Sequence, residues 1–288
     1  MPSSASRSAS WLLIFALVVP ANLAAQDSYK NFNEAFNAGA KLLRDQQYAA
    51  AQAPLEAALK LATDDKDRLK AYQALVPAYR QLPEIDKMLE AQEFVIRHTE
   101  RRAGRSNSAG DLASFLHQRG KTDAAIDRYE AALKTDAKDV AALAVLQTIH
   151  TKTKRDPQRG PEYTKRLEAL DKELAGQLAQ RLEKDAESAP QTGASILKDA
   201  ATAWLEAGEN AKALAAAKKS LASLPEDRGE LLVYFWRRGL GDVFLATGEP
   251  AEAVKQFESA LTVVKIDGYR KDTEKQLADA KAAVAKKP

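Results

Sequence analysis

Three histidines are the side chains of this sequence best suited to metal ligation or general acid–base chemistry. None of His98, His117 and His150 has a second histidine four residues away with a glutamate in between, which is the spacing of a helical zinc site. His117 lies next to Gln118 at the end of an expected helix. We interpret it as a solvated or hydrogen-bonded side chain rather than a metal ligand or general base. The sequence therefore predicts no metal site.

The other chemical motifs point away from catalysis. The chain has no Cys, which excludes a thiolate nucleophile, a disulfide and a cysteine-ligated metal. Its carboxylates lie three or four residues from Lys or Arg, as on solvated helix faces, and nothing indicates a cleft that would pair two acids for glycoside hydrolysis. The stretch Gly239-Leu240-Gly241 resembles the start of a phosphate-binding GxGxxG loop, but Phe244 replaces the third glycine and no strand pattern precedes it. We predict a protein that is not an enzyme and binds no cofactor.

The N-terminal segment has the features of a secretory signal peptide. Arg7 precedes the uncharged run Trp11–Val19, and the small residues Ala24 and Ala25 follow. The run is shorter than the roughly 20 residues that span a bilayer, which favours cleavage near Ala25 over an uncleaved anchor or a buried helix. We expect an exported protein, periplasmic or secreted, with no stable membrane insertion once residues 1–25 are removed.

Charge patterning disfavours two further partner classes. The chain has 43 Lys and Arg against 40 Asp and Glu, and opposite charges alternate along it, so no cluster of cations indicates a nucleic-acid partner. The C-terminal run from Arg270 to Pro288 is basic, but its apolar positions are Ala-rich and include no Trp or Phe. We interpret it as a solvated capping helix rather than a membrane-binding helix.

Three segments share one arrangement of small and large apolar residues around a glycine. The clearest copy, Phe235–Val264, places Leu240, Gly241 and Phe244 before Gly248, and Ala253, Phe257, Ala260 and Leu261 after it. The same offsets recur around Gly120 and Gly208. An earlier segment around Gly39 fits as well, although Gln46 stands where the turn glycine would be.

This arrangement resembles the tetratricopeptide repeat (TPR), a helix-turn-helix unit of 34 residues, and Leu240-Gly241-x2-Phe244 carries the closest match. Helix-forming residues dominate and strand-type alternation is missing. We therefore predict an all-α fold, which the resemblance makes a right-handed α-solenoid with a C-terminal capping helix. The expected organisation is one solenoid over 26–288, with repeats at about 32–65, 69–100, 106–138, 139–176 (degenerate), 194–227 and 234–267, and the capping helix at 268–286.

The sizes of the repeated residues also indicate stacked helix pairs, independently of the family resemblance. Small residues at Gly241, Ala253 and Ala260 let two antiparallel helices approach closely, and each pair needs a neighbour to bury its second face. Clusters of Gly, Pro and Ser predict loops at 99–110, 154–161 and 187–193. The last of these could act as a hinge between two halves.

The resemblance also implies a concave groove, lined by the first helix of each repeat, that holds a partner's helix or an extended peptide. By register, the groove-facing residues are Asn33, Asn37, Arg44, Lys70, Gln73, Arg80, Ser114, His117, Lys198, Thr202, Phe235, Arg238 and Asp242. Their excess of basic and amide groups indicates an acidic or polar ligand, although solvated helix faces would look the same. Phe36 and Ala40 stand where some family members hold a C-terminal carboxylate, so that ligand is not expected.

The sequence thus predicts a protein-protein interaction scaffold of the bacterial cell envelope. A second hypothesis is a self-assembling structural subunit, a homo-oligomer or an accessory part of an envelope machine. A weaker third is a hydrolase or sugar-binding module on a helical scaffold. Trp204 and Trp236 both lie within repeats, where packing already explains them.

Overall fold

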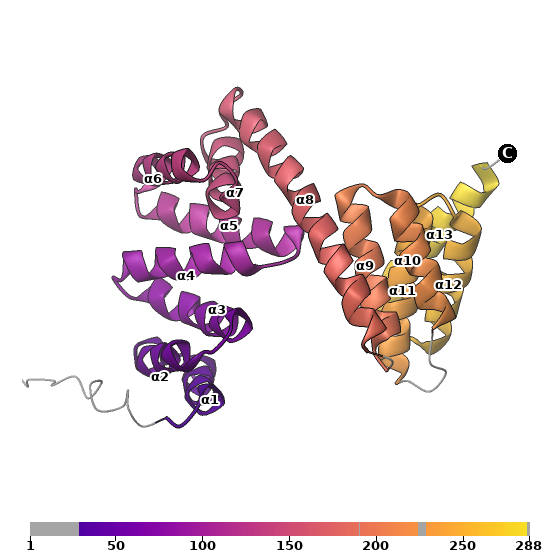
Figure 1. Cartoon of the computed structure of the whole chain (residues 1–288), viewed down its shortest axis with the longest axis horizontal. Coiled ribbons are helices and arrows are strands. Elements are labelled where there is room, and N and C mark those ends of the chain that lie inside the picture. The colour runs from indigo at the N-terminus through magenta and orange to yellow at the C-terminus, as the bar shows by residue number, and fades with distance from the viewer. Residues whose placement is uncertain (1–28, 190, 224–228, 287–288) are drawn as a thin grey trace, which may run out of the picture. The chain divides into compact units, whose positions relative to one another are not determined.

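The computed structural model describes residues 29–189, 191–223 and 229–286 (Figure 1). Over these residues the chain forms thirteen α-helices, one π-helical turn and no strand. The predicted signal peptide, residues 1–25, lies outside the described part. The elements are α1 (Phe32–Arg44), α2 (Tyr48–Leu61), α3 (Asp65–Gln81), α4 (Ile85–His98), α5 (Arg102–Gln118), α6 (Thr122–Thr135), α7 (Val140–Thr148), the π-turn η1 (Ile149–Thr153), α8 (Arg159–Glu187), α9 (Gly193–Ala207), α10 (Asn210–Ala222), α11 (Glu230–Ala246), α12 (Pro250–Val263) and α13 (Asp267–Lys286).

The chain divides into two compact units, and the boundary falls inside α4 between Ala91 and Gln92. In the first unit α1 packs on α2, and α2 packs on α3. Gly39 permits the first contact, because a Cβ atom there would lie 2.4 Å from Cγ of Leu55. The prediction of a single solenoid domain stays a prediction.

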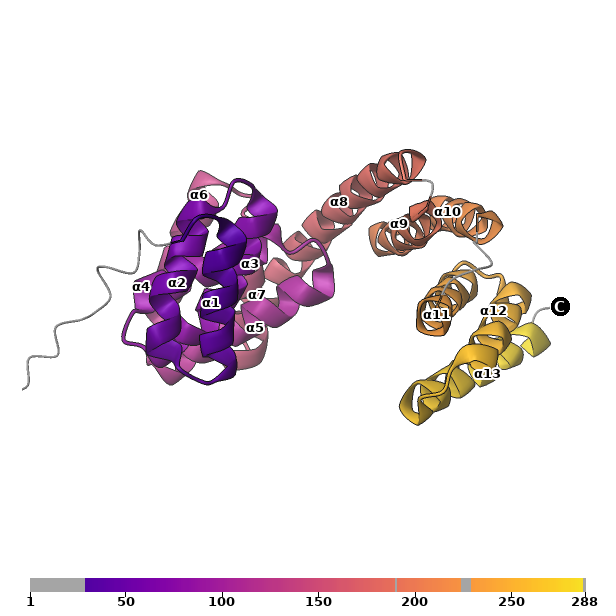
Figure 2. The same cartoon turned by 90° about the horizontal axis from the view of Figure 1, so that it is seen from below.

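The second unit is built from successive helix pairs. Helix α9 packs on α10, α11 packs on α12, and α13 covers the last pair (Figure 2). Trp204, Phe244 and Phe257 are buried in one apolar cluster of these helices, to which α13 contributes Ala280. The predicted all-α fold of stacked helix-turn-helix units with a C-terminal capping helix is confirmed.

Left-handed backbone ends the first helix of several pairs. Gly120, Gly208 and Gly248 have φ angles of 64°, 83° and 81°, a conformation that glycine adopts without the steric cost of a side chain. Gln46 occupies the same place in the first pair with φ 57°. The shared turn of the sequence repeat is therefore a shared backbone conformation.

Two predicted loops are shorter than expected. Helix α5 begins at Arg102, so most of the predicted loop 99–110 is helical, and α8 begins at Arg159, inside the predicted loop 154–161. Buried pairing explains the first difference, because Arg105 in α5 donates to Asp171 in α8 at 2.5 Å. The second helix of the degenerate repeat also continues to Glu187, past the expected end at residue 176.

Candidate functional site

Helix α11 presents three of the predicted groove residues on one face. Phe235, Arg238 and Asp242 are three and four residues apart, a spacing that aligns side chains along a helix. Gln276 of α13 joins two of them, because it accepts from Arg238 Nε at 2.9 Å and donates to Asp242 Oδ1 at 2.6 Å. The capping helix therefore fixes the polar half of this face.

Helix α9 supplies Lys198 and Thr202 beside α11. A Cβ atom on Gly239 would lie 3.0 Å from Cδ of Lys198, so the lysine stem crosses the α11 backbone at its glycine. The Lys198 ammonium pairs with Asp199 at 2.9 Å, and the Thr202 hydroxyl donates to the Lys198 carbonyl at 3.1 Å. Both polar groups thus have partners on their own helix.

Acidic residues that the sequence did not predict for this site balance the charge of this face. Arg101 approaches Asp199 at 3.6 Å and Glu206 at 3.5 Å. Burial raises the pKa of the Asp242 carboxyl, and the Arg238 charge and the Gln276 hydrogen bond oppose that rise. With its cations largely paired, the face offers little net charge for an acidic ligand.

An apolar surface lies at the start of α11. We name Leu231, Leu232, Phe235 and Ile266 the α11 patch; their exposed fractions are 53%, 47%, 40% and 50%. The Phe235 ring meets Tyr269 edge to face at 5.2 Å, and a Lys265–Glu230 ion pair of 2.6 Å joins the residues that flank the patch. Of the large apolar side chains that are exposed in the described part of the chain, only Val284 lies outside it.

On α5 the predicted groove residues Ser114 and His117 are exposed. His117 Nδ1 lies 3.4 Å from the Thr122 hydroxyl at the start of α6. This contact agrees with a hydrogen-bonded side chain at a helix end.

The first unit carries the other six predicted groove residues. Asn33, Asn37 and Arg44 are exposed on α1, and Gln73 is exposed and Arg80 half-buried on α3. Lys70 of α3 pairs with Asp67 at 3.0 Å and lies 5.7 Å from the Phe32 ring of α1. Part of this set is therefore brought to the junction of α1 and α3, and a groove that joins it to the second unit stays a prediction.

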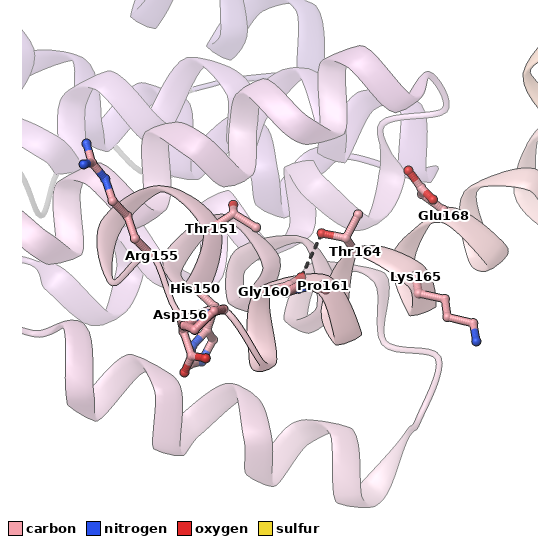
Figure 3. Close-up of a pocket in the computed structure, with 10 residues that line it drawn as sticks. His150, Thr151, Arg155, Asp156, Gly160, Pro161, Thr164, Lys165 and Glu168 are labelled. Atoms are coloured by element: carbon pink, nitrogen blue, oxygen red, sulfur yellow. Dashed lines mark hydrogen bonds and ion pairs between the residues drawn. The ribbon is translucent and has the colours of Figure 1, made fainter.

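A second candidate site surrounds the π-turn, where the sequence repeat is degenerate. A cavity of about 660 Å³ opens between the turn and the start of α8, lined by His150, Thr151, Arg155, Asp156, Pro157, Gly160, Pro161, Thr164, Lys165 and Glu168 (Figure 3). His150 is 2% exposed, and neither ring nitrogen makes a hydrogen bond within the described residues. Burial lowers its pKa, partly offset by the charge of Asp156. The sequence reading missed this site, because a single histidine in a poorly matched repeat gives no motif.

Metal-binding clusters and membrane-spanning helices are both missing from residues 29–189, 191–223 and 229–286. No group of three or more His, Asp or Glu side chains there is placed to hold a metal ion. No helix in the same ranges combines the length and apolar character needed to cross a bilayer.

Comparisons with known proteins show remote structural similarity only. No protein family model matches the chain, and no curated protein matches it significantly. A thermophilic TPR protein of Thermus thermophilus is 21% identical over 87% of this chain and 99% of its own, with a TM-score of 0.33. A tetratricopeptide repeat protein of Parabacteroides merdae is 14% identical over 86% of this chain and 98% of its own, with a TM-score of 0.29. Neither structure superposes on the whole chain at such scores, so the fold description rests on the helix pairs themselves.

Proposed function

We propose that this protein is a non-catalytic scaffold that binds a partner protein on the face that α11 and α13 form in its second unit. The α11 patch is the observation that carries the proposal. Soluble proteins rarely leave several large apolar side chains exposed together, and such clusters mark interaction surfaces. Here four of them gather around the start of one helix, including Phe235, which the repeat register also places in the groove.

The chemistry of the face defines the partner segment. Phe235 and Tyr269 form an aromatic corner beside two exposed leucines, which suits a large apolar anchor residue on the partner. Arg238, Asp242 and Gln276 follow along α11 and already form one hydrogen-bonded set. They would add polar contacts and direction rather than net charge, so the partner is a peptide or helix with an apolar anchor and uncharged polar neighbours.

The site of action follows from the N-terminal segment. We propose that the apolar run at 11–19 directs export and that the scaffold works in the bacterial cell envelope. The test is to recover the protein from the envelope and to determine its first residue. A mature chain that begins near residue 26 supports it, and a chain that begins at Met1 contradicts it.

The alternative function is a self-assembling structural subunit, and the same patch favours it, because exposed apolar surface also joins identical chains. The two functions differ in what covers the α11 patch. A scaffold is monomeric until its partner binds, whereas a structural subunit is an oligomer when pure. Analytical ultracentrifugation of the purified mature chain separates them.

The deciding experiment uses a pair of matched variants. Phe235 and Val284 are both 40% exposed, so Phe235→Ser and Val284→Ser remove similar apolar exposure from different places. The mature chain is crosslinked in envelope extracts, its partner is identified, and binding of the purified partner to each variant is measured by calorimetry. Loss of binding in Phe235→Ser alone supports the proposal.

Two outcomes contradict this scaffold function. Equal partner affinity in both variants would move the interface away from the α11 patch. An oligomer of the parent chain that dissociates in Phe235→Ser, with no partner recovered, would establish the structural alternative.

A further inference from the structure

The connection between α7 and α8 departs from regular helix geometry twice within seven residues. Ile149–Thr153 form a π-turn, with Lys154 N–H donating to the Ile149 carbonyl at 2.8 Å. Arg155 then adopts φ 51°, which is strained for a residue with a side chain. Single π-turns inside α-helices are uncommon and often accompany function.

The buried ring of His150 sits within this irregular backbone. It stacks on Tyr163 of α8, with 5.4 Å between ring centroids. Its Nδ1 atom lies 3.5 Å from Asp156 Oδ2, and both ring nitrogens lack a hydrogen bond in the described structure. A buried imidazole without hydrogen bonds loses its hydration without replacing it, and this loss disfavours the charged form of the ring most.

The charged groups around the ring already have other partners. Asp156 Oδ1 accepts from the backbone N–H groups of Gln158 and Arg159 at 2.9 and 3.0 Å, and so caps the start of α8. Arg159 pairs with Glu130 of α6 at 2.5 Å, and the Tyr163 hydroxyl donates to the same Glu130 carboxylate at 3.3 Å.

Helix α5 also packs on the π-turn. The buried side chains of its C-terminal half are apolar: Leu112, Ala113, Phe115 and Leu116. Among the groups that act on the ring, Asp156 and Glu130 favour the imidazolium, while Arg159 and the burial itself oppose it.

We propose that this connection is an acid-responsive latch, closed while His150 is neutral and opened when the ring is protonated and moves into water beside Asp156. The adjoining cavity borders the turn and the first residues of α8 and is open to solvent (Figure 3). The ring therefore has a short path to water that needs no opening of α7. The released segment is 149–158, between two helices that stay folded.

The direction of the pH effect follows from proton linkage. Burial holds the pKa of His150 below its ordinary value of 6.5, against the opposing effect of Asp156. The open form therefore binds a proton more readily than the closed form, and acid favours opening. The closed latch is fully favoured above pH 6.5 and loses that advantage as the pH falls through the lower pKa of the closed form.

Hydrogen exchange of the complete mature chain at pH 7.5 and pH 5 tests the latch. After correction for the intrinsic pH dependence of exchange, we expect protection of residues 149–158 to fall severalfold at pH 5, while α11 and α12 keep theirs. His150→Gln keeps a neutral polar side chain of similar length and should abolish this pH dependence. His117→Gln, at an exposed histidine, should keep it.

A second variant keeps the proposal testable if His150→Gln does not fold. Asp156→Asn retains a side-chain oxygen that can cap α8 but removes the negative charge beside the ring. The pKa of His150, followed by the NMR signal of its ring, should then fall further than in the parent.

Either of two results overturns the latch. One is protection of residues 149–158 that does not change with pH in the parent chain. The other is a pKa of His150 at or above its ordinary value of 6.5, because such a ring is not held in its neutral form.

Discussion

The helix pairs α11–α12 and α7–α8 must both bury apolar residues of their first helix, and they do so in different ways. In α11 the buried residues occupy one face, and Gly241 lets Phe257 pack directly on the helix backbone. In α7 every residue from Val140 to Leu146 is buried, because α5, α6 and α8 all contact this short helix. One pair ends its first helix with Gly248, and the other continues into the π-turn.

This difference decides which of the two first helices keeps an exposed face. An exposed face on α11 leaves Phe235, Arg238 and Asp242 available, whereas α7 has no face left for a ligand. The irregular connection after α7 is instead where a buried titratable group is found, His150. The proposed binding surface therefore lies on the regular pair, and the proposed latch lies in the irregular pair.

Charge insertion should have the largest effect in both pairs. In α12, Ala253→Glu buries an unpaired carboxylate and should lower the free energy of unfolding by several kcal/mol. Ala251→Glu, at an exposed position of the same helix, should change it little. In α7, Glu at any of Ala141, Ala142 and Ala144 should be as costly as at Ala253, since all three are buried. Urea unfolding followed by circular dichroism measures each effect. A tolerated Glu in α7 would show that one of its sides faces water.

Glycine replacement should have opposite signs in the two regions. A Cβ atom on Gly241 would lie 2.5 Å from the Phe257 ring, so Gly241→Ala should destabilise by about 1–3 kcal/mol through overpacking. A Cβ atom on Gly176, within α8, would meet Trp204 at 3.8 Å and Ala207 at 3.9 Å, which are ordinary contacts. Gly176→Ala should therefore stabilise by up to about 1 kcal/mol, because Ala favours the helix. Thermal unfolding of both variants checks the signs, and equal signs would contradict the packing described for α11.

The contrast also shows what the sequence could predict. Gly241, Ala253 and Phe257 form a local pattern with fixed spacing, and helix pairing follows directly from such spacing. The first and second helices of each repeat could be placed for the same reason. The turn glycines were visible because left-handed backbone favours one residue type.

Contacts between distant residues explain what the sequence could not show. The segment 99–110 is rich in Gly and Ser, yet most of it is helical, because Arg105 bonds both the Thr99 carbonyl and Asp171, 66 residues further along. Leu231 fits a buried helix position equally well by periodicity, and only its neighbours decide that it is exposed. The candidate surface at α11 could thus be predicted for Phe235 and Arg238 but not for the apolar residues beside them.

The turns should show a smaller effect of about 1 kcal/mol. Gly248→Ala forces a side chain into the left-handed region and should destabilise by about 1 kcal/mol. Arg155→Gly and Gln46→Gly relieve that strain at φ 51° and 57° and should stabilise by up to about 1 kcal/mol. Urea midpoints measure all three. Destabilisation by Arg155→Gly would mean that the arginine side chain contributes more to the π-turn than its backbone strain costs.

The pH dependence of stability should show the smallest effect, and it compares one titratable group in each pair. His150 in the irregular pair and Asp242 in the regular pair are both held towards their neutral forms, by burial of the ring and of the carboxyl. For Asp242 the folded pKa lies above its ordinary value of 3.8, so the folded state binds more protons between these two pKa values and stability falls as the pH rises through that window. For His150 stability falls as the pH decreases below 6.5, so the two groups act in opposite directions.

Asp242→Asn isolates the acid half of this comparison. It keeps an oxygen that can accept from Gln276 and removes the carboxylate, so the decline of stability above pH 3.8 should become shallower while the decline below pH 6.5 stays unchanged. His150→Gln should do the reverse. Urea midpoints of both variants across pH 3 to 8 give the test, with Asp111→Asn on the exposed side of α5 as control. If Asp242→Asn altered the decline of stability that His150→Gln removes, the two groups would be coupled, and the proposed binding surface and the proposed latch would not be independent.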